Sequence, residues 1–190
     1  MKRTWMTVSL MLASTSALAH TGHDVHGFAS GMAHPLGGLD HLLAMLAVGM
    51  WSATAMPRQW WAGAAAFMAA MLIGATLGIG GVTLPLLEPG IALSVVVMGL
   101  LVIGFSRLGA TPALSLIAAF ALFHGNAHGV EAPAGGAVAL YLLGFLLSTG
   151  LLHLAGVGIG ALTVRSAQLW VLRLFGAGLS AVGAWLLLAS

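Results

Sequence analysis

Long apolar runs separated by short polar breaks divide this chain into six segments that can each cross a membrane as a helix. The runs cover residues 35–52, 60–82, 89–105, 111–128, 134–163 and 168–188, and about 20 apolar residues suffice for one crossing. Proline or a charged residue marks each break, as expected where a helix ends. The fifth run is the longest, so we expect it to tilt or to extend beyond the hydrocarbon. The pattern predicts an all-α membrane protein built as a six-transmembrane-helix bundle.

The first 19 residues have the features of a cleavable secretory signal peptide. Lys2 and Arg3 precede an apolar stretch that is too short to span, and Ala17-Leu18-Ala19 has the form of a cleavage site. An uncleaved short anchor is the alternative. We therefore expect residues 1–19 to be a signal peptide, residues 20–33 a periplasmic histidine-rich segment, and residues 34–190 the transmembrane domain.

The charged residues predict the orientation of the bundle. Arginine occurs in the first, third and fifth connections and just inside the last run, at Arg58, Arg107, Arg165 and Arg173. The second and fourth connections instead hold Glu88 and Glu131. Because cytoplasmic connections are enriched in Lys and Arg, we expect the mature N-terminus and the C-terminus to be periplasmic, in a bacterial inner membrane.

Composition excludes several classes of protein. The 190 residues are 60% hydrophobic and only 5% charged, with a mean hydropathy of +1.06, whereas soluble domains carry about 25% charged residues. The lipid bilayer is therefore the expected solvent, and the lack of a basic patch argues against nucleic acid as a partner. The chain has no cysteine, which excludes disulfides, thiolate metal sites and cysteine nucleophiles. The oligomeric state stays open.

Titratable side chains within apolar membrane segments are energetically costly, and they usually mark a pathway or a ligand site. The first cluster contains His34, Asp40 and His41. Pro35 suits the first turn of a helix, which would place His34 at the entrance and let His34 and His41 share one helical face. Gly37-Gly38 would keep that face open. Asp40 either binds a ligand directly or orients a histidine.

The second cluster contains His124, His128 and Glu131. The two histidines are four residues apart, so they stack on one face of a helix and can hold one ion together. Glu131 is expected near the outer surface, where it would attract a cation. Gly125 and Gly129 are expected to remove bulk beside the histidines.

We expect the two clusters to meet between the first and fourth transmembrane helices. Imidazole and carboxylate ligands suit a divalent first-row ion, and imidazole favours Ni, Cu, Zn or Fe over Mg or Ca. Because metal binding needs neutral imidazole, uptake should weaken below about pH 6. The alternative is that the histidines only hydrogen-bond the helices together.

Several other residues have two possible interpretations. The N-terminal tail contains His20, His23 and His26, which either capture metal or belong to a solvated terminus. His153 is either an inner relay for metal or protons, or a packing residue. Met45 either offers a soft sulfur or packs in the core. The pairs Gly74-x3-Gly78 and Gly156-x3-Gly160 are expected to let helices approach closely.

The sequence resembles the HupE/UreJ family of nickel and cobalt membrane transporters. The resemblance rests on His-x5-Asp-His at residues 34–41, Leu-Ala-Met-Leu-Ala-Val-Gly at residues 43–49, and Phe-His-Gly-x-Ala-His-Gly-x-Glu at residues 123–131. It implies a secondary permease domain over residues 34–190 that takes up Ni2+, or Co2+ in some members, alongside hydrogenase or urease maturation. It implies no nucleotide and no organic cofactor. The residues that it assigns to the metal are His34, Asp40, His41, His124, His128 and Glu131.

Two other functions fit the same residues. An intramembrane zinc-type metallohydrolase would use the cluster to activate water, with Asp40 or Glu131 as the base. A membrane metal-binding or sensor protein would bind the ion without transporting it. The identity of the metal rests on the resemblance alone, because ligand chemistry leaves zinc or iron open.

Overall fold

The computed structural model describes residues 27–104, 107–132, 135 and 137–189, and the regular elements in these ranges are all helices. They are α2 (Phe28–Gly37), α3 (Leu39–Ala55), the 3-10 turn η1 (Pro57–Gln59), α4 (Ala62–Ile79), α5 (Leu87–Gly104), α6 (Ala110–Val130), α7 (Val138–Arg165) and α8 (Leu169–Ala189). The predicted all-α class is confirmed. The predicted signal peptide and the tail histidines His20, His23 and His26 lie outside the described residues.

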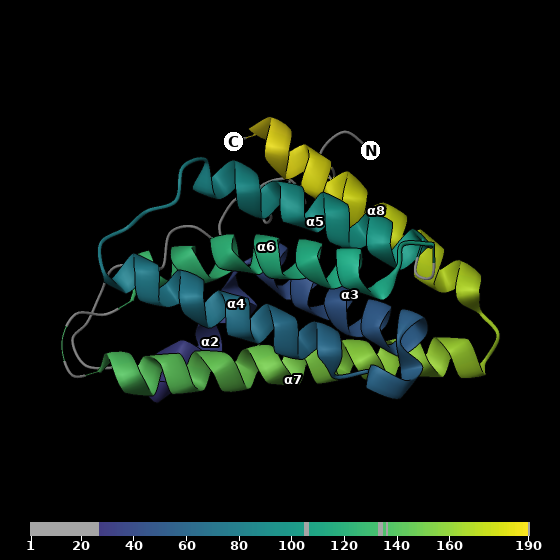
Figure 1. The fold of residues 1–190 in the computed structure, drawn as a ribbon, viewed down its shortest axis with the longest axis horizontal. Coiled ribbons are helices and arrows are strands. Elements are labelled where there is room, and N and C mark those ends of the chain that lie inside the picture. The colour runs from purple at the N-terminus through teal and green to yellow at the C-terminus, as the bar shows by residue number, and fades with distance from the viewer. Residues whose placement is uncertain (1–26, 105–106, 133–134, 136, 190) are drawn as a thin grey trace, which may run out of the picture.

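Membrane-spanning helices account for most of this chain. Five described helices, α4 to α8, are long and apolar enough to cross a membrane, and α2 and α3 together make a sixth if the bent pair forms one span. The long helices lie roughly along one axis (Figure 1). The protein is therefore an all-α membrane bundle, with the six predicted runs recovered as five straight helices and one broken pair.

The broken pair corrects the prediction for the first run. The helix begins at Phe28 rather than Pro35, ends at Gly37, and resumes at Leu39 after a bend of 86°. Pro35 thus lies near the end of α2, where it lacks the N–H that would extend the helix, and two successive glycines have low helix propensity. His34 and His41 consequently belong to two different helices, and the expectation that they share one helical face is wrong.

Helix α7 supports both halves of the broken pair. A Cβ on Gly31 of α2 would clash with the Tyr141 carbonyl, and a Cβ on Gly156 of α7 would clash with the Leu46 carbonyl of α3. The helix has 28 residues, about 42 Å at 1.5 Å per residue, which exceeds a hydrocarbon core of about 30 Å. The expectation of an unusually long fifth span is confirmed, and it gives α7 the length to contact α2 and α3 in succession.

Helices α4 and α6 are packed backbone to backbone. A Cβ on Gly74 would meet the Leu122 carbonyl, and a Cβ on Gly125 or Gly129 would meet carbonyls of α4. The expected close approach at Gly74-x3-Gly78 is confirmed, and Gly156-x3-Gly160 makes the same kind of contact with α3. The role expected of Gly125 and Gly129 is corrected, because their open sides face α4. Their effect is to lock α6, and therefore its histidines, against α4.

The ends of the bundle differ in charge. The C-terminal ends of α4 and α6 lie at the same end as the N-terminal ends of α5 and α7 (Figure 1). Glu88 lies in the first turn of α5 and Glu131 caps the end of α6. Arg58 lies in η1 and Arg165 ends α7, both at the opposite end. The acidic side chains and the histidine clusters therefore share one end of the molecule.

Candidate metal site

The break between α2 and α3 positions three predicted residues. His34 is in the last turn of α2, whereas Asp40 and His41 are in the first turn of α3. The His41 backbone N–H donates to Asp40 Oδ1 at 2.8 Å, and His41 Nδ1 lies 2.8 Å from the same oxygen. A carboxylate only accepts hydrogen bonds, so the neutral ring carries its proton on Nδ1. Its Nε2 then keeps a free lone pair, and this buried atom has no hydrogen-bond partner among the described residues.

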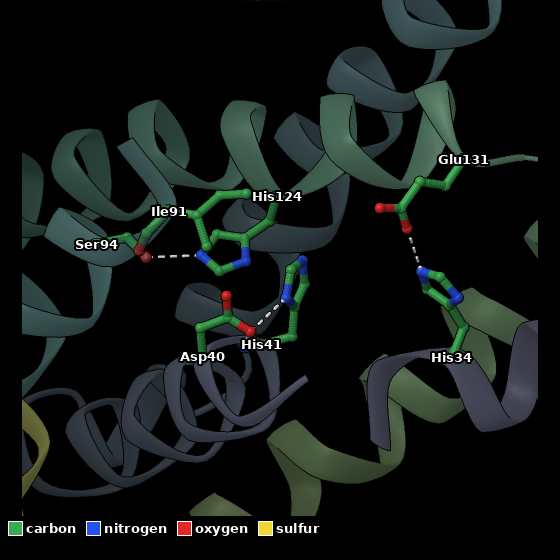
Figure 2. A network of polar contacts seen from close by, with 7 residues as sticks. All are labelled: His34, Asp40, His41, Ile91, Ser94, His124 and Glu131. Carbon is green, nitrogen blue, oxygen red and sulfur yellow. Dashed lines mark hydrogen bonds and ion pairs between the residues drawn. The ribbon is translucent and has the colours of Figure 1, made fainter. Parts of the chain in front are cut away.

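A serine that the sequence analysis did not single out fixes the ring of His124. Ser94 of α5 donates to the Ile91 carbonyl at 2.6 Å, and its oxygen lies 2.6 Å from His124 Nε2 (Figure 2). Since the serine proton points to the carbonyl, the neutral histidine donates from Nε2 and keeps its lone pair on Nδ1. That Nδ1 is also buried and without a described partner. The sequence offered little signal for this role, because a serine in an apolar run usually bonds only its own helix.

His128 lies at the centre of the histidines. Its ring centroid is 4.6 Å from that of His34 and 4.3 Å from that of His41, and the rings of His41 and His124 are 4.6 Å apart. Neither nitrogen of His128 has a hydrogen-bond partner among the described residues. The structure therefore brings all four motif histidines together as a continuous row, in the order His34, His128, His41, His124.

The two ends of this row differ in burial. At one end, Glu131 Oε2 lies 3.1 Å from His34 Nε2, with the two side chains 60% and 30% exposed (Figure 2). This hydrogen bond from His34 lowers the pKa of the Glu131 carboxyl. His128 and His124 are 1% and 0% exposed, and the side chain of His41 between them is 12% exposed. The row thus leads from an exposed carboxylate to a fully buried ring.

The outer end of the row has metal-site geometry. One ligand atom each from His34, His128 and Glu131 lie within 4.8 Å of one another. Ligands about 2.0–2.2 Å from one ion are at most about 4.4 Å apart, so small side-chain movements would let these three share an ion. Imidazole and carboxylate donors suit first-row divalent ions.

A cavity of about 490 Å³ opens onto the site. Its polar lining consists mainly of carboxylates and imidazoles, from His34, Asp40, His41, Glu88, His128 and Glu131. Glu88 was expected from the sequence only to mark a periplasmic connection. The sequence could have identified Glu88 as a site residue, because an acidic residue followed by proline at the start of an apolar helix is unusual. Asp40 and Glu88 also line a neighbouring cavity of about 300 Å³ beside the end of α8.

Asn126, inside the second histidine cluster, was also missed. The side chain is fully buried. It donates to the Gly74 and Val82 carbonyls at 3.3 and 2.7 Å, and accepts from the Leu84 N–H at 2.8 Å. These bonds attach the connection between α4 and α5 to α6. Asn126 therefore fixes the segment that leads into Glu88.

The remaining predicted residues lie apart from the row. His153 is buried on α7, and the Phe67 ring contacts both it and His124, with centroids 5.0 and 5.5 Å away. Met45 is fully buried in the hydrophobic core, which agrees with its interpretation as a packing residue.

The row leaves an unusual number of buried nitrogens unpaired. Buried polar atoms in proteins nearly always have partners, because leaving one without a hydrogen bond is costly. Here His41 Nε2, His124 Nδ1 and both nitrogens of His128 have none within the described part of the chain. Asp40 and Ser94 each hold a neighbouring ring in the tautomer that presents a lone pair. This is the arrangement expected of rings prepared to coordinate a cation.

The chain is similar to a known protein family and to a curated protein. A model of one family, described as HupE / UreJ protein, matches residues 8–186. The chain is 38% identical over 181 residues to a curated relative called Protein HupE, from Rhizobium leguminosarum bv. viciae, covering 95% of each chain. No solved structure shows a significant match.

Proposed function

Because the chain belongs to the HupE / UreJ family, we propose that it is a secondary permease for Ni2+, or Co2+, that supplies hydrogenase or urease maturation. The family association supports the choice of metal. The single observation that carries the transport proposal is the row of histidines, which runs from an exposed carboxylate to a fully buried ring. A purely structural set of histidines would satisfy its own nitrogens, whereas four buried nitrogens of this row have no hydrogen-bond partner among the described residues.

Entry begins at the acidic cavity. Carboxylates of Asp40, Glu88 and Glu131 line or border it, and a cleft of one charge sign raises the local concentration of counter-ions. His34, His128 and Glu131 then form the first ligand set. The Glu131 carboxyl keeps a lowered pKa through its hydrogen bond with His34, so it stays anionic as a ligand.

The metal ion moves inward by exchanging one imidazole ligand for the next. Neighbouring rings in the row have centroids 4.3 to 4.6 Å apart, so an ion can gain one ring before it loses another. Asp40 holds His41, and Ser94 holds His124, in the tautomer that presents a lone pair. A membrane potential contributes about 2.3 kcal/mol per charge per 100 mV, and therefore about twice that for a dication moving inward.

The proposed setting is a bacterial inner membrane with both mature termini in the periplasm. The arginine-bearing connections lie at the end opposite the histidine row, and cytoplasmic sides favour arginine. The acidic cavity would then face the periplasm. His20, His23 and His26 would capture metal there and pass it to His34.

Nickel accumulation by cells at limiting nickel tests the proposal. We expect His128→Ala to reduce uptake at least tenfold at equal protein level, since loss of even a group that only orients a metal ligand typically costs about 10–100-fold. Leu116→Ala, at an exposed position of the same helix, is the matched control and should transport normally. Wild-type uptake by His128→Ala would reject the assignment.

Purified protein in proteoliposomes separates the proposal from its two alternatives. We expect nickel to accumulate inside vesicles when an inside-negative potential is imposed. Tight binding without flux would instead identify a membrane metal-binding or sensor protein. Hydrolysis of a peptide or lipid that stops on metal removal would identify a metallohydrolase.

A further inference from the structure

Helix α7 carries a buried stripe that the proposed pathway above does not use. Tyr141, Phe145, Thr149 and His153 are four residues apart and are 2%, 1%, 0% and 1% exposed. Residues at this spacing lie on one face of a helix. The stripe therefore forms a continuous inner wall of the bundle.

The outer half of this stripe runs beside the histidine row. The Tyr141 ring lies 5.7 Å from His34, and the Phe145 ring lies 4.1 Å from His128. From Phe145 to His153 the helix advances about 12 Å at 1.5 Å per residue. Thr149 and His153 thus extend the wall two turns further from the acidic cavity.

His153 is held in one tautomer. Its Nδ1 lies 2.8 Å from the Thr149 carbonyl oxygen, and a carbonyl only accepts, so the neutral ring donates from Nδ1 and keeps its lone pair on Nε2. This Nε2 and the Thr149 hydroxyl oxygen are buried and have no hydrogen-bond partner among the described residues. A histidine that served only packing would leave this nitrogen unexplained, because an unpaired buried polar atom costs about 1–3 kcal/mol.

One aromatic ring contacts both His153 and the innermost member of the row. Phe67 of α4 is fully buried and lies 5.5 Å from His124 and 5.0 Å from His153, between ring centroids. Movement of this ring would therefore change the surroundings of both histidines.

We propose that His153 and the Thr149 hydroxyl form a second, inner station for the divalent cation, reached from His124 when Phe67 moves. This inference rests on the proposed transport function. The station offers one imidazole nitrogen and one neutral oxygen, whereas the outer site offers several imidazoles and a carboxylate. It therefore binds more weakly, which favours release inward, since conduction needs sites that let the ion leave.

Equilibrium binding separates the station from a packing role. Purified wild-type protein titrated with Co2+, whose visible absorption reports its ligands, should show a tight and a weak class of site. His153→Phe should lose the weak class, keep the tight class and unfold at a similar temperature. In proteoliposomes the same variant should lower the maximal Ni2+ flux at least tenfold with little change in the half-saturating concentration. Unchanged flux and unchanged stoichiometry in His153→Phe would overturn the inference.

A cysteine replacement tests coordination directly. The chain has no cysteine, so His153→Cys introduces a unique thiol that differs in shape from imidazole but also binds metal. We expect this variant to recover part of the flux lost in His153→Phe, and Ni2+ to protect the thiol from a small alkylating reagent. Absence of both rescue and protection would count against a ligand role.

His41→Ala distinguishes failure of the inference from failure of the proposed function. If His41→Ala loses uptake while His153→Phe transports normally, only the inner station is wrong. If His41→Ala transports like the wild type, the proposed function fails and the inner station fails with it.

Discussion

His41 and His128 lie with their ring centroids 4.3 Å apart, although they belong to two polar clusters that are far apart in the sequence. Their helices, α3 and α6, share few other contacts. Each is instead held by a third helix, α3 by glycine contacts with α7 and α6 by glycine contacts with α4. The meeting of the two rings therefore depends on the packing of the whole bundle.

Removing the Asp40 carboxylate should weaken metal binding. In Asp40→Ala, His41 Nδ1 loses its acceptor, so the ring is free to rotate and change tautomer. We expect the affinity of the purified protein for Ni2+ to fall about 10–100-fold, as for other groups that orient metal-binding histidines. Asp40→Asn keeps an oxygen that can accept from Nδ1, so it should retain part of the affinity. If Asn is as damaging as Ala, Asp40 acts as a direct ligand instead.

Ser94→Ala should affect stability and uptake together. Without the hydroxyl, His124 Nε2–H is buried and unpaired, at a cost of about 1–3 kcal/mol, unless the proton moves to Nδ1 and removes the lone pair that faces the row. Thermal unfolding and Ni2+ uptake measure the two effects. Ser180→Ala is the control, because it removes a bond between α8 and the Val96 carbonyl that involves no histidine. It should reduce stability slightly and leave uptake unchanged.

The α4–α6 contact should tolerate no added methyl group. In Gly125→Ala the new Cβ would clash with the Met71 carbonyl, and overpacking of this kind typically costs about 1–3 kcal/mol. Gly178→Ala on α8 adds the same atom where nothing lies within 4 Å. That change should be neutral or stabilising by up to about 1 kcal/mol, since Ala is the better helix former. Thermal unfolding in detergent compares the two, and equal effects would contradict the packing argument.

Uptake should fall in acid. Imidazole binds metal only when neutral and has an ordinary pKa of about 6.5, so binding is fully present above this value and is lost as the pH falls through it. The hydrogen bond from His34 lowers the pKa of Glu131, so its carboxylate remains charged over the same interval and does not account for the loss. Proteoliposome flux with equal internal and external pH measures this without a proton gradient. Undiminished flux at about pH 5 would contradict this pH dependence.

Local information was enough for much of this protein. The lengths of apolar runs, the charged breaks and the four-residue spacing of His124 and His128 depend only on neighbours in the chain, so the helices and the clusters were predictable from the sequence. The break in the helix of the first apolar run could not be predicted from local information. The bend at Gly38 depends on two glycines and on the surface of α7 against which both halves pack, and it overturned the expected shared face of His34 and His41.

Other supports of the site were decided by tertiary structure. Ser94 and Glu88 come from α5, and Asn126 bonds to α4 and to the connection after it, so no local pattern predicts these contacts. The tautomer of His124 follows from Ser94, whereas that of His41 follows from its neighbour Asp40. The order His34, His128, His41, His124 follows from the packing of the helices. The sequence determined that imidazoles would lie inside a membrane bundle, because hydropathy and helical periodicity are local properties. Only the glycine-mediated approach of distant helices decided which nitrogens face one another, because that depends on backbone contacts between segments far apart in the chain.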